Sequence, residues 1–400
     1  MNSKINHFFK ICFLILVLSL ASELTAFTAT LTPKTKVYLV TMGPGDELYS
    51  GFGHSAIWFQ DSTLLMDRVY NYGTFPFDGS FYMKFTRGIL DYMLSVHDFH
   101  YLMDDAQEEQ RYLTLQELNL SSNQKENLFA FLEHNYLPEN KFYRYDFFYD
   151  NCSSRIRDVF STVCGDSLKY DLSENKNLSF RQLIDLYLHD KRLQDFGMDI
   201  GLGAPADVKA TPAQYMFLPE FLKQGFDKAQ IKTSAGWKPL VKEETKLFTP
   251  TLVRNPEPTN YTAWACWALC IAVVIFTYMT MTKPFAGRGF DTIWFIITGL
   301  LGWLLIFLWF FTDHNTTQMN CDLLWAMPLN LFVAVFIWKR TNFNWLIGYL
   351  LFLLVCCLVL LFGWKYLPEE MNPAVFPLVI LSLSRLMKLL YDKMSMFHKG

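Results

Sequence analysis

The amino-acid sequence predicts an exported α+β domain followed by an all-α bundle of five transmembrane helices. Three observations predict this arrangement. A short apolar core follows basic residues at the N-terminus, as in a secretory signal. The middle of the chain mixes strand-like and helix-like apolar patterns, as an α+β domain does. From Tyr261 onward, long apolar segments follow one another at short intervals, and the chain as a whole is only 18% charged.

Residues 1–26 have the pattern of a signal peptide. Lys4 and Lys10 precede the apolar core ICFLILVLSLAS, and the residues LTA ending at Ala26 offer a cleavage site. A core of about a dozen residues is short for a membrane span, which needs about 20. We therefore expect residues 1–26 to direct export and to be removed. An uncleaved anchor is the alternative.

Five apolar segments follow Tyr261, each near the ~20 residues that cross a bilayer. They are residues 261–282, 290–311, 321–338, 344–364 and 374–391. Alternate links and the tail are basic, with Lys283, Arg288, Lys339, Arg340, Arg385, Lys388, Lys393 and Lys399. The opposite links are mainly acidic, with Asp313, Asp322, Glu369 and Glu370. By the positive-inside rule the basic links are cytoplasmic, so the segment before Tyr261 lies outside, as the signal also requires.

These signals predict a multi-pass protein of the inner (cytoplasmic) membrane. We expect residues 27–260 to form a periplasmic domain and residues 261–400 to form a membrane domain with a cytoplasmic C-terminus. The net charge of -3 and the lack of a basic patch argue against a nucleic-acid partner.

The periplasmic domain contains two cysteines, Cys152 and Cys164. A structural disulfide would be the ordinary use of such a pair in an oxidising compartment. Twelve residues of continuous helix, however, separate their Cα atoms by about 18 Å, whereas a disulfide needs roughly 4.4–6.8 Å. We therefore expect Cys152 to be a free thiol.

Sequence patterns place several elements around these cysteines. Residues 36–42 read as a buried strand, and residues 55–60 and 64–73 read as a hairpin joined by a turn at 61–63. Ser121 and Gln124 have the spacing of a capping box at the start of a helix. Residues 179–193 read as another helix, and residues 197–219, rich in Gly and Pro, read as surface loops.

Cys152 lies at the start of a strongly patterned helix. Apolar residues recur at the spacing of one buried helical face, namely Ile156, Val159, Phe160, Val163 and Cys164. Asp150 or Asn151 can cap this helix, and Gly165 can end it. Unsatisfied N–H groups and the helix dipole favour an anion at such a start, which prepares a nucleophilic thiolate.

A cysteine nucleophile needs a base, and His54 is the best candidate. His54 follows the turn GFG and opens a strand, whereas His134 and His189 lie among charged residues near helix ends. His97 and His100 have a metal-binding spacing, but no further Cys or His ligands cluster near them, so we expect no metal site and no cofactor. A histidine that precedes its cysteine by 98 residues has the order of circularly permuted papain-like proteins. The alternative is an unrelated turn histidine and core cysteine.

The third member of the site is left open by the sequence. A turn at 61–63 would pair His54 with a residue near Tyr70, so Asp67, Asn71 or Tyr72 can orient the imidazole ring, and we prefer Asn71. Tyr72 is also a candidate for binding substrate.

Three further residues are candidates for substrate binding. Arg155, one turn from the thiol, can contact a lipid phosphate. Asn151 and Glu47 are the other two candidates. All three are also consistent with purely structural or solvated positions.

Four motifs, in order along the chain, resemble the Bacteroides-type lipoprotein N-acyltransferase family, Lnb. They are GPGDELYSGFGHSAIWF (43–59), DRVYNYGTFPF (67–77), YDFFYDNCSSRIRD (145–158) and MFLPEFL (216–222), followed by membrane segments with DHN at 313–315. The resemblance implies a permuted papain-like (NlpC/P60-like) periplasmic domain with His54 and Cys152 as the catalytic pair. The family's usual Thr after its cysteine is Ser153 here.

The resemblance further implies that a phospholipid donates an acyl chain to Cys152 as a thioester, and that the α-amino group of a diacylated lipoprotein accepts it. A papain-like hydrolase anchored in the membrane, either a cell-wall amidase or peptidase or a phospholipase, is the alternative enzyme. A membrane-anchored binding protein in which His54 and Cys152 are structural is the third interpretation.

Overall fold

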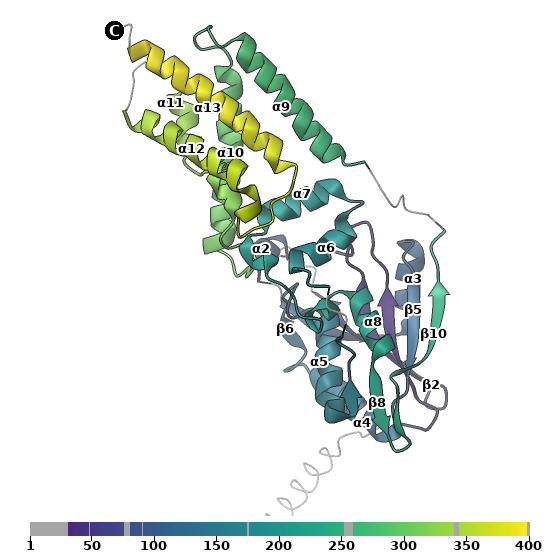
Figure 1. Cartoon of the computed structure of the whole chain (residues 1–400). Helices are drawn as coiled ribbons and strands as arrows, with labels where there is room; N and C mark the ends of the chain where they lie inside the picture. Colours follow the sequence, from purple (N-terminus) through teal and green to yellow (C-terminus); the bar gives the residue numbers. More distant parts are fainter. Residues whose placement is uncertain are drawn as a thin grey trace, which may run out of the picture.

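The computed structural model describes residues 31–47, 49–75, 81–89, 91–173, 176–251, 259–339 and 344–397. The predicted signal peptide, residues 1–26, lies outside these ranges. A sheet-containing domain occupies one end of the molecule and a bundle of helices the other, with α6 (Phe180–Leu188) and α7 (Arg192–Gly201) between them (Figure 1).

A seven-stranded sheet is the centre of the first domain, and every neighbouring pair in it is antiparallel. Its order is β10-β5-β1-β2-β3-β4-β6. The strands are β1 (Lys36–Met42), β2 (His54–Asp61), β3 (Met66–Thr74), β4 (Asp91–His97), β5 (Leu113–Leu118), β6 (Phe142–Arg144) and β10 (Val241–Phe248). A second, three-stranded sheet contains β7 (Leu168–Lys169), β8 (Gln230–Thr233) and β9 (Gly236–Pro239).

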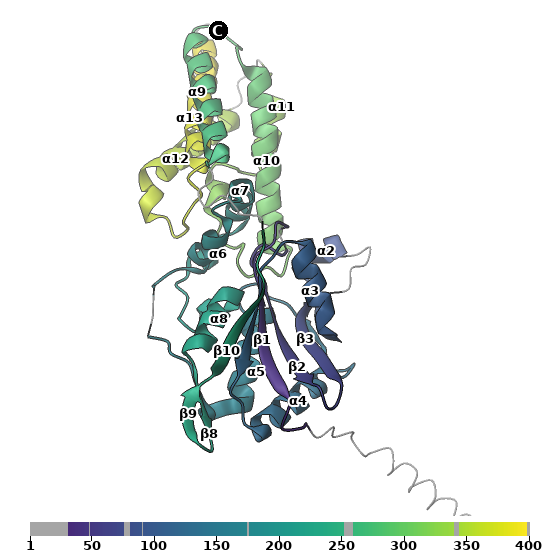
Figure 2. The ribbon, with the colours of Figure 1, turned by 90° about the vertical axis from the view of Figure 1, so that its right-hand side faces the viewer.

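Helices cover both faces of the large sheet (Figure 2). Successive residues of a strand point to opposite faces, so Leu39 and Ile57 join one apolar core while their neighbours Val40 and Ala56 join another. The first core is closed by α4 (Ser122–Tyr136), α5 (Cys152–Cys164) and α8 (Pro219–Lys228). The second is closed by α3 (Phe99–Glu108). Short elements complete the domain, namely α2 (Phe81–Thr86), η1 (Gly165–Ser167), η2 (Ala204–Asp207) and η3 (Gln214–Phe217).

The predicted capping box of α4 is confirmed: the Ser121 side chain accepts the Gln124 N–H, and the Gln124 side chain accepts the Ser121 N–H. The predicted helix over 179–193 is wrong in extent. α6 ends at Leu188, and α7 begins at Arg192 and runs into the segment expected to be loop.

The hairpin turn also differs from the expectation. β2 ends at Asp61 and β3 begins at Met66, so the turn contains four residues, 62–65, instead of lying at 61–63. The Asp61 carboxylate accepts the N–H groups of Thr63 and Leu64, which extends the turn. Tyr70 therefore pairs with Ile57 instead of with His54, so the register differs from the expected one by three residues.

In the second part of the chain, among the described residues, three helices are long and apolar enough to cross a membrane. They are Tyr261–Met279, Arg288–Phe310 and Asn344–Tyr366. They correspond to α9 (Tyr261–Met279), α10 (Arg288–Phe310) and α12 (Asn344–Gly363), the last extended by η5 (Trp364–Tyr366).

The two remaining apolar segments take different forms. Residues 321–338 contain two short helices, η4 (Cys321–Leu324) and α11 (Asn330–Phe336), because Pro328 lies between them and interrupts helical hydrogen bonding. α13 (Val375–Phe397) is long, but its C-terminal half carries charged residues. Arg385 of α13 forms a buried ion pair with Asp291 of α10 at 2.6 Å.

A buried polar network joins the two parts of the molecule. Arg181 of α6 is fully buried and binds Asp199 of α7 at 2.7 Å and Asp207 at 3.1 Å. Asn372, which precedes α13, donates to the Asp199 carboxylate at 2.9 Å. Asn320, which precedes η4, donates to the Ile200 carbonyl at 2.7 Å. The loops of the membrane domain therefore hold α7 at several points.

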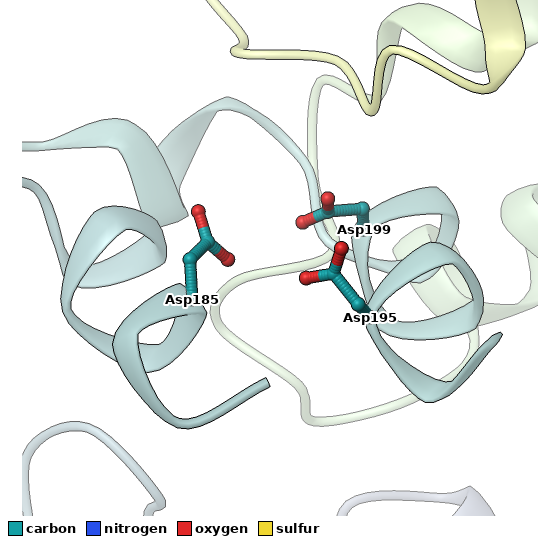
Figure 3. A group of neighbouring side chains, drawn as sticks. All are labelled: Asp185, Asp195 and Asp199. Carbon is teal, nitrogen blue, oxygen red and sulfur yellow. The ribbon is translucent and has the colours of Figure 1, made fainter. Parts of the chain in front are cut away.

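Three carboxylates of α6 and α7 point toward one another at this junction, Asp185, Asp195 and Asp199 (Figure 3). One oxygen from each lies within 4.8 Å of the others. Burial, and then the charges of Asp199 and Asp195, raise the pKa of Asp185 to about 8. Burial, and then the charge of Asp199, raise the pKa of Asp195 to about 6. The cluster is therefore partly protonated at neutral pH.

Replacing Asp185 with Asn should stabilise the fold increasingly as pH rises. The folded pKa of Asp185, about 8, exceeds its ordinary value of 3.8. The wild type therefore loses stability between about pH 4 and pH 8, because the unfolded state releases a proton that the folded state retains. The amide side chain of the Asp185→Asn variant has no such proton to release. Thermal unfolding of detergent-solubilised protein at pH 5, 6.5 and 8 measures the difference.

The control is Asp166→Asn, which changes an exposed carboxylate of the same domain. The gain in midpoint temperature for Asp185→Asn should grow from pH 5 to pH 8, and that for Asp166→Asn should not. A gain that is constant or shrinks with pH would contradict a raised pKa at position 185.

Candidate active site

The start of α5 is fixed by Asn151. Its side-chain oxygen accepts the N–H groups of Ser153 and Ser154, both at 2.9 Å, and the Ser154 hydroxyl accepts the Asn151 N–H at 2.8 Å. The Asn151 side-chain NH₂ donates to the carbonyls of Phe147 and Phe217, both at 2.8 Å. Asn151 is 3% exposed, so this amide anchors the helix start from the inside.

Cys152 is the first residue of α5, and it is a free thiol, as is Cys164 at the other end of the helix. The prediction that the two do not form a disulfide is therefore confirmed. Cys152 is buried at the edge of the core, and its Sγ lies 3.9 Å from the Ser153 hydroxyl. The Ser153 hydroxyl is in turn 3.0 Å from the hydroxyl of Ser55 on β2.

His54 is the first residue of β2, so the contact between Ser55 and Ser153 brings it beside Cys152. Its Nε2 lies 2.9 Å from the side-chain oxygen of Asn71 on β3. The same oxygen accepts the N–H of Gly73 at 2.7 Å. A donor from the backbone thus identifies the Asn71 oxygen as an acceptor, so His54 Nε2 carries the hydrogen. His54, Cys152 and Asn71 are brought together.

The electrostatics of the site favour a thiolate. Burial acts to raise the pKa of the Cys152 thiol, but the His54 imidazole opposes it, first by charge and then by hydrogen bonding. The Ser55 backbone and the Ser153 hydroxyl act in the same direction as His54. The net pKa of Cys152 is lowered from its usual value. Cys164, which has no such neighbours, has its pKa raised by burial to about 11.

Three tyrosines form an aromatic wall beside the thiol, and no pattern in the sequence singled them out. Burial, followed by the charge of Cys152, raises the pKa of Tyr92, Tyr143 and Tyr145. The Tyr92 and Tyr145 rings stack with centroids 4.1 Å apart. These tyrosines belong to β4, β6 and the segment after β6, and no local pattern relates them to Cys152. They keep the thiol in a largely dry environment.

A second histidine also adjoins the site. His97 Nε2 lies 3.5 Å from the side-chain nitrogen of Asn71, and His97 Nδ1 lies 3.0 Å from the Asp98 carbonyl. In the sequence, His97 stood out only for its spacing to His100, which is typical of a metal site. His97 ends β4, whereas His100 lies in α3. In the described part of the chain, the three carboxylates Asp185, Asp195 and Asp199 form the metal-compatible group, and it includes neither histidine.

The candidate substrate-binding residues have different surroundings. Arg155 forms an ion pair with Asp150 at 2.7 Å, and its guanidinium lies 3.6 Å from the centre of the Tyr143 ring. Tyr72 is 2% exposed, belongs to the core, and accepts a hydrogen bond from Asn135 at 2.9 Å. Glu47 is exposed in the turn that precedes His54.

These surroundings separate the four candidates. Asn151 and Tyr72 are occupied by protein contacts, so the structure gives both a structural use. Arg155 and Glu47 keep exposed surface, since 28% of the Arg155 side chain is accessible. Of the four, these two therefore have surface that a substrate can reach.

Changing Gly73 to Ala should impair the site without unfolding it. A Cβ atom at this position would overlap Cε1 of the His54 ring and crowd the Asn71 oxygen. The ring must move away from Asn71, so we expect Cys152 alkylation at pH 7 to slow by roughly tenfold, the effect of one pKa unit. Iodoacetamide labelling followed by peptide mass spectrometry measures this rate at Cys152 alone.

Gly197→Ala is the matched control, because a Cβ there meets no neighbouring atom. It should leave the alkylation rate unchanged. Equal rates in both variants would show that the His54 ring does not depend on the space above Gly73.

Two family models match the chain. Residues 23–185 match the Lnb N-terminal periplasmic domain. Residues 243–395 match the Lnb transmembrane domain. No curated protein and no solved structure matches the chain.

The two matches occur in sequence order and do not overlap. The first includes β2, β3 and α5, which carry the candidate site. The second includes the three helices that are long and apolar enough to cross a membrane. The expectations of a membrane protein with a periplasmic domain are thus confirmed. The chain therefore belongs to the Lnb family of lipoprotein N-acyltransferases, with a periplasmic domain followed by a transmembrane domain.

Proposed function

We propose that this protein transfers an acyl chain from a phospholipid to Cys152, and from Cys152 to the α-amino group of diacylglyceryl-cysteine in a lipoprotein. The observation that carries the proposal is the free Cys152 thiol beside His54, with its pKa lowered, in a chain of the Lnb family. Papain-like enzymes use such a pair, and a cysteine at a helix start beside a strand histidine supports a permuted papain-like domain here.

In the first half of the reaction, His54 accepts the proton of Cys152 and the thiolate attacks an ester carbonyl of the phospholipid. Because His54 Nε2 is hydrogen-bonded to Asn71, Nδ1 is the ring nitrogen that exchanges the proton with Cys152. The tetrahedral intermediate collapses with cleavage of the ester C–O bond. The lysophospholipid leaves with the proton from His54, and Cys152 keeps the acyl group as a thioester.

The developing oxyanion needs hydrogen-bond donors at the start of α5. Asn151 already occupies the N–H groups of Ser153 and Ser154. We therefore assign the Cys152 N–H as the backbone donor to the oxyanion. The N-terminal end of the helix dipole also favours negative charge at this position.

In the second half of the reaction, the α-amino group of the lipoprotein attacks the thioester. His54 takes a proton from the amine, the C–S bond breaks, and the Cys152 thiolate is regenerated while an amide forms. The waiting thioester must be protected from water. The wall of Tyr92, Tyr143 and Tyr145 supports this protection.

Both substrates are confined to a membrane, and the architecture of the protein fits that confinement. We propose an inner-membrane protein in which residues 27–260 are periplasmic and residues 261–400 cross the bilayer five times. The ion pair of Arg385 with Asp291 supports α13 as a spanning helix, because pairing lowers the cost of charge in a bilayer. Confinement to one leaflet raises the effective concentration of both substrates at the thiol.

Arg155 and Glu47 are the proposed contacts for the substrate head groups. Arg155 is partly exposed, so its guanidinium can exchange the two-point contact with the Asp150 carboxylate for a phosphate, which offers the same pair of acceptor oxygens. Its stacking on Tyr143 fixes the guanidinium close to the thiol. Asn71 is the proposed third catalytic residue because it holds the imidazole ring.

Cys152→Ala should abolish acyl transfer, and Cys164→Ala at the other end of α5 should retain it. Incubation with phospholipid carrying a radiolabelled acyl chain should label the wild type with a hydroxylamine-sensitive bond. Added diacylated lipopeptide should then take up the label as a hydroxylamine-resistant amide.

The same assay separates this function from the alternatives. A phospholipase would release labelled fatty acid without labelling the lipopeptide, and a peptidase or a binding protein would not acquire label. Mass spectrometry of lipoprotein N-termini from cells carrying only Cys152→Ala supplies the second readout. Triacylated lipoproteins in those cells, with the variant folded, would overturn the proposal.

A further inference from the structure

A loop of the membrane domain contacts the segment that leads into Cys152. This loop, residues 311–320, links α10 to η4. The side-chain NH₂ of Asn315 donates to the Asp146 carboxylate at 2.8 Å. Asp313 forms an ion pair with Arg144, and its N–H donates to the Arg87 carbonyl at 2.9 Å. Two separate segments of the periplasmic domain, around Arg87 and at residues 144–146, therefore meet the same loop.

Asp146 organises the turn that precedes α5. While one carboxylate oxygen faces Asn315, the other accepts the N–H groups of Phe148 and Tyr149, both at 3.0 Å. The Asp146 backbone also pairs with Asp150 through hydrogen bonds of 3.0 and 2.9 Å. The Asp146 side chain therefore fixes the shape of residues 146–150 with one oxygen and holds the membrane domain with the other.

Asn151 links this turn to Cys152. The Asn151 side chain donates to the carbonyl of Phe147, which lies inside the turn. Its oxygen caps the helix at Ser153 and Ser154. A displacement of the turn therefore moves the anchor of Asn151, and with it the N–H groups and the thiol at the start of α5.

The loop itself is held firmly enough to act as a support. The Thr317 hydroxyl donates to the Leu308 carbonyl in the last turn of α10 at 2.9 Å. The Gly203 N–H donates to the Thr316 carbonyl at 2.7 Å. Gly88, at φ +70°, lies so close to the backbone of His314 that a Cβ atom would come within 2.9 Å of its nitrogen.

We propose that Asn315 is a positioning residue for Cys152, so that the membrane domain supplies part of the support of the active site in addition to anchoring it. The part of this inference that concerns acyl transfer rests on the function proposed above. The part that concerns the reactivity of the thiol does not. If Asn315 only docked the two domains together, its replacement would leave the reactivity of the Cys152 thiol unchanged.

The test uses the full-length protein in detergent and four variants. Asn315→Ala removes the donor to Asp146. Asn315→Asp places two carboxylates face to face. Asp146→Asn combined with Asn315→Asp exchanges donor and acceptor, and the amide oxygen of the new side chain still accepts the N–H groups of Phe148 and Tyr149. Gln318→Ala is the control, because its exposed side chain lies on the same loop.

The main readout is the pH dependence of Cys152 alkylation by iodoacetamide, measured by peptide mass spectrometry. Asn315→Ala should shift the midpoint to higher pH and slow the reaction at pH 7 by about tenfold, the effect of one pKa unit. Asn315→Asp should slow it further. The exchanged pair should return the rate to within about threefold of the wild type, which corresponds to less than half a pKa unit. Gln318→Ala should match the wild type.

Thermal unfolding of each variant shows whether it folds, and the two single variants provide the test if the exchanged pair does not. A wild-type alkylation profile in folded Asn315→Ala and Asn315→Asp would overturn the inference. So would a folded exchanged pair that is as slow as the single variants. Phospholipid labelling of Cys152, run in parallel, tests the proposed function separately, because thiol reactivity can depend on Asn315 even in a protein that transfers no acyl group.

Discussion

One buried amide, the side chain of Asn151, is the contact on which the candidate site depends. It caps α5 with its oxygen and ties that helix to two carbonyls with its nitrogen. A buried amide with every partner satisfied is rigid, because losing any partner leaves an unpaired polar group inside the protein. Cys152 follows it directly, so these buried hydrogen bonds fix the position of the thiol, and the contact between Asn315 and Asp146 supports them from the membrane domain.

The sheet supplies the other half of the site, and fixed hydrogen bonds hold this half in place too. β2 and β3 carry His54 and Asn71, and their register is set by the Asp61 turn at the far end of the hairpin. Gly73 leaves space for the imidazole ring. A hydrogen bond between the hydroxyls of Ser55 and Ser153 then joins this hairpin to α5. Two rigid elements thus hold the candidate catalytic groups, which favours a preorganised site over one assembled by substrate.

Local patterns in the sequence predicted α5, its cap at Asp150 or Asn151, and the candidates Cys152 and His54, because capping and apolar spacing are short-range properties. Asn71 was preferred from a hairpin register that the longer turn at 62–65 changes. Local patterns did not predict the wall of Tyr92, Tyr143 and Tyr145, which depends on the pairing of β4 with β6. β10 was missed because it is a largely exposed edge strand of mostly polar residues. The five apolar segments were visible, but the break at Pro328 and the buried charges of α13 depend on packing between helices that no single segment shows.

The long separation between the two halves of the site has a consequence for the life of the protein before it folds. Ser55 and Ser153, which join those halves, are 98 residues apart. In a newly exported, unfolded chain Cys152 has no imidazole beside it and no helix beneath it, so it behaves as an ordinary and mostly protonated thiol. Such a thiol reacts slowly with oxidants and oxidoreductases. Reactivity thus arises only when folding is complete and the sulfur is already enclosed.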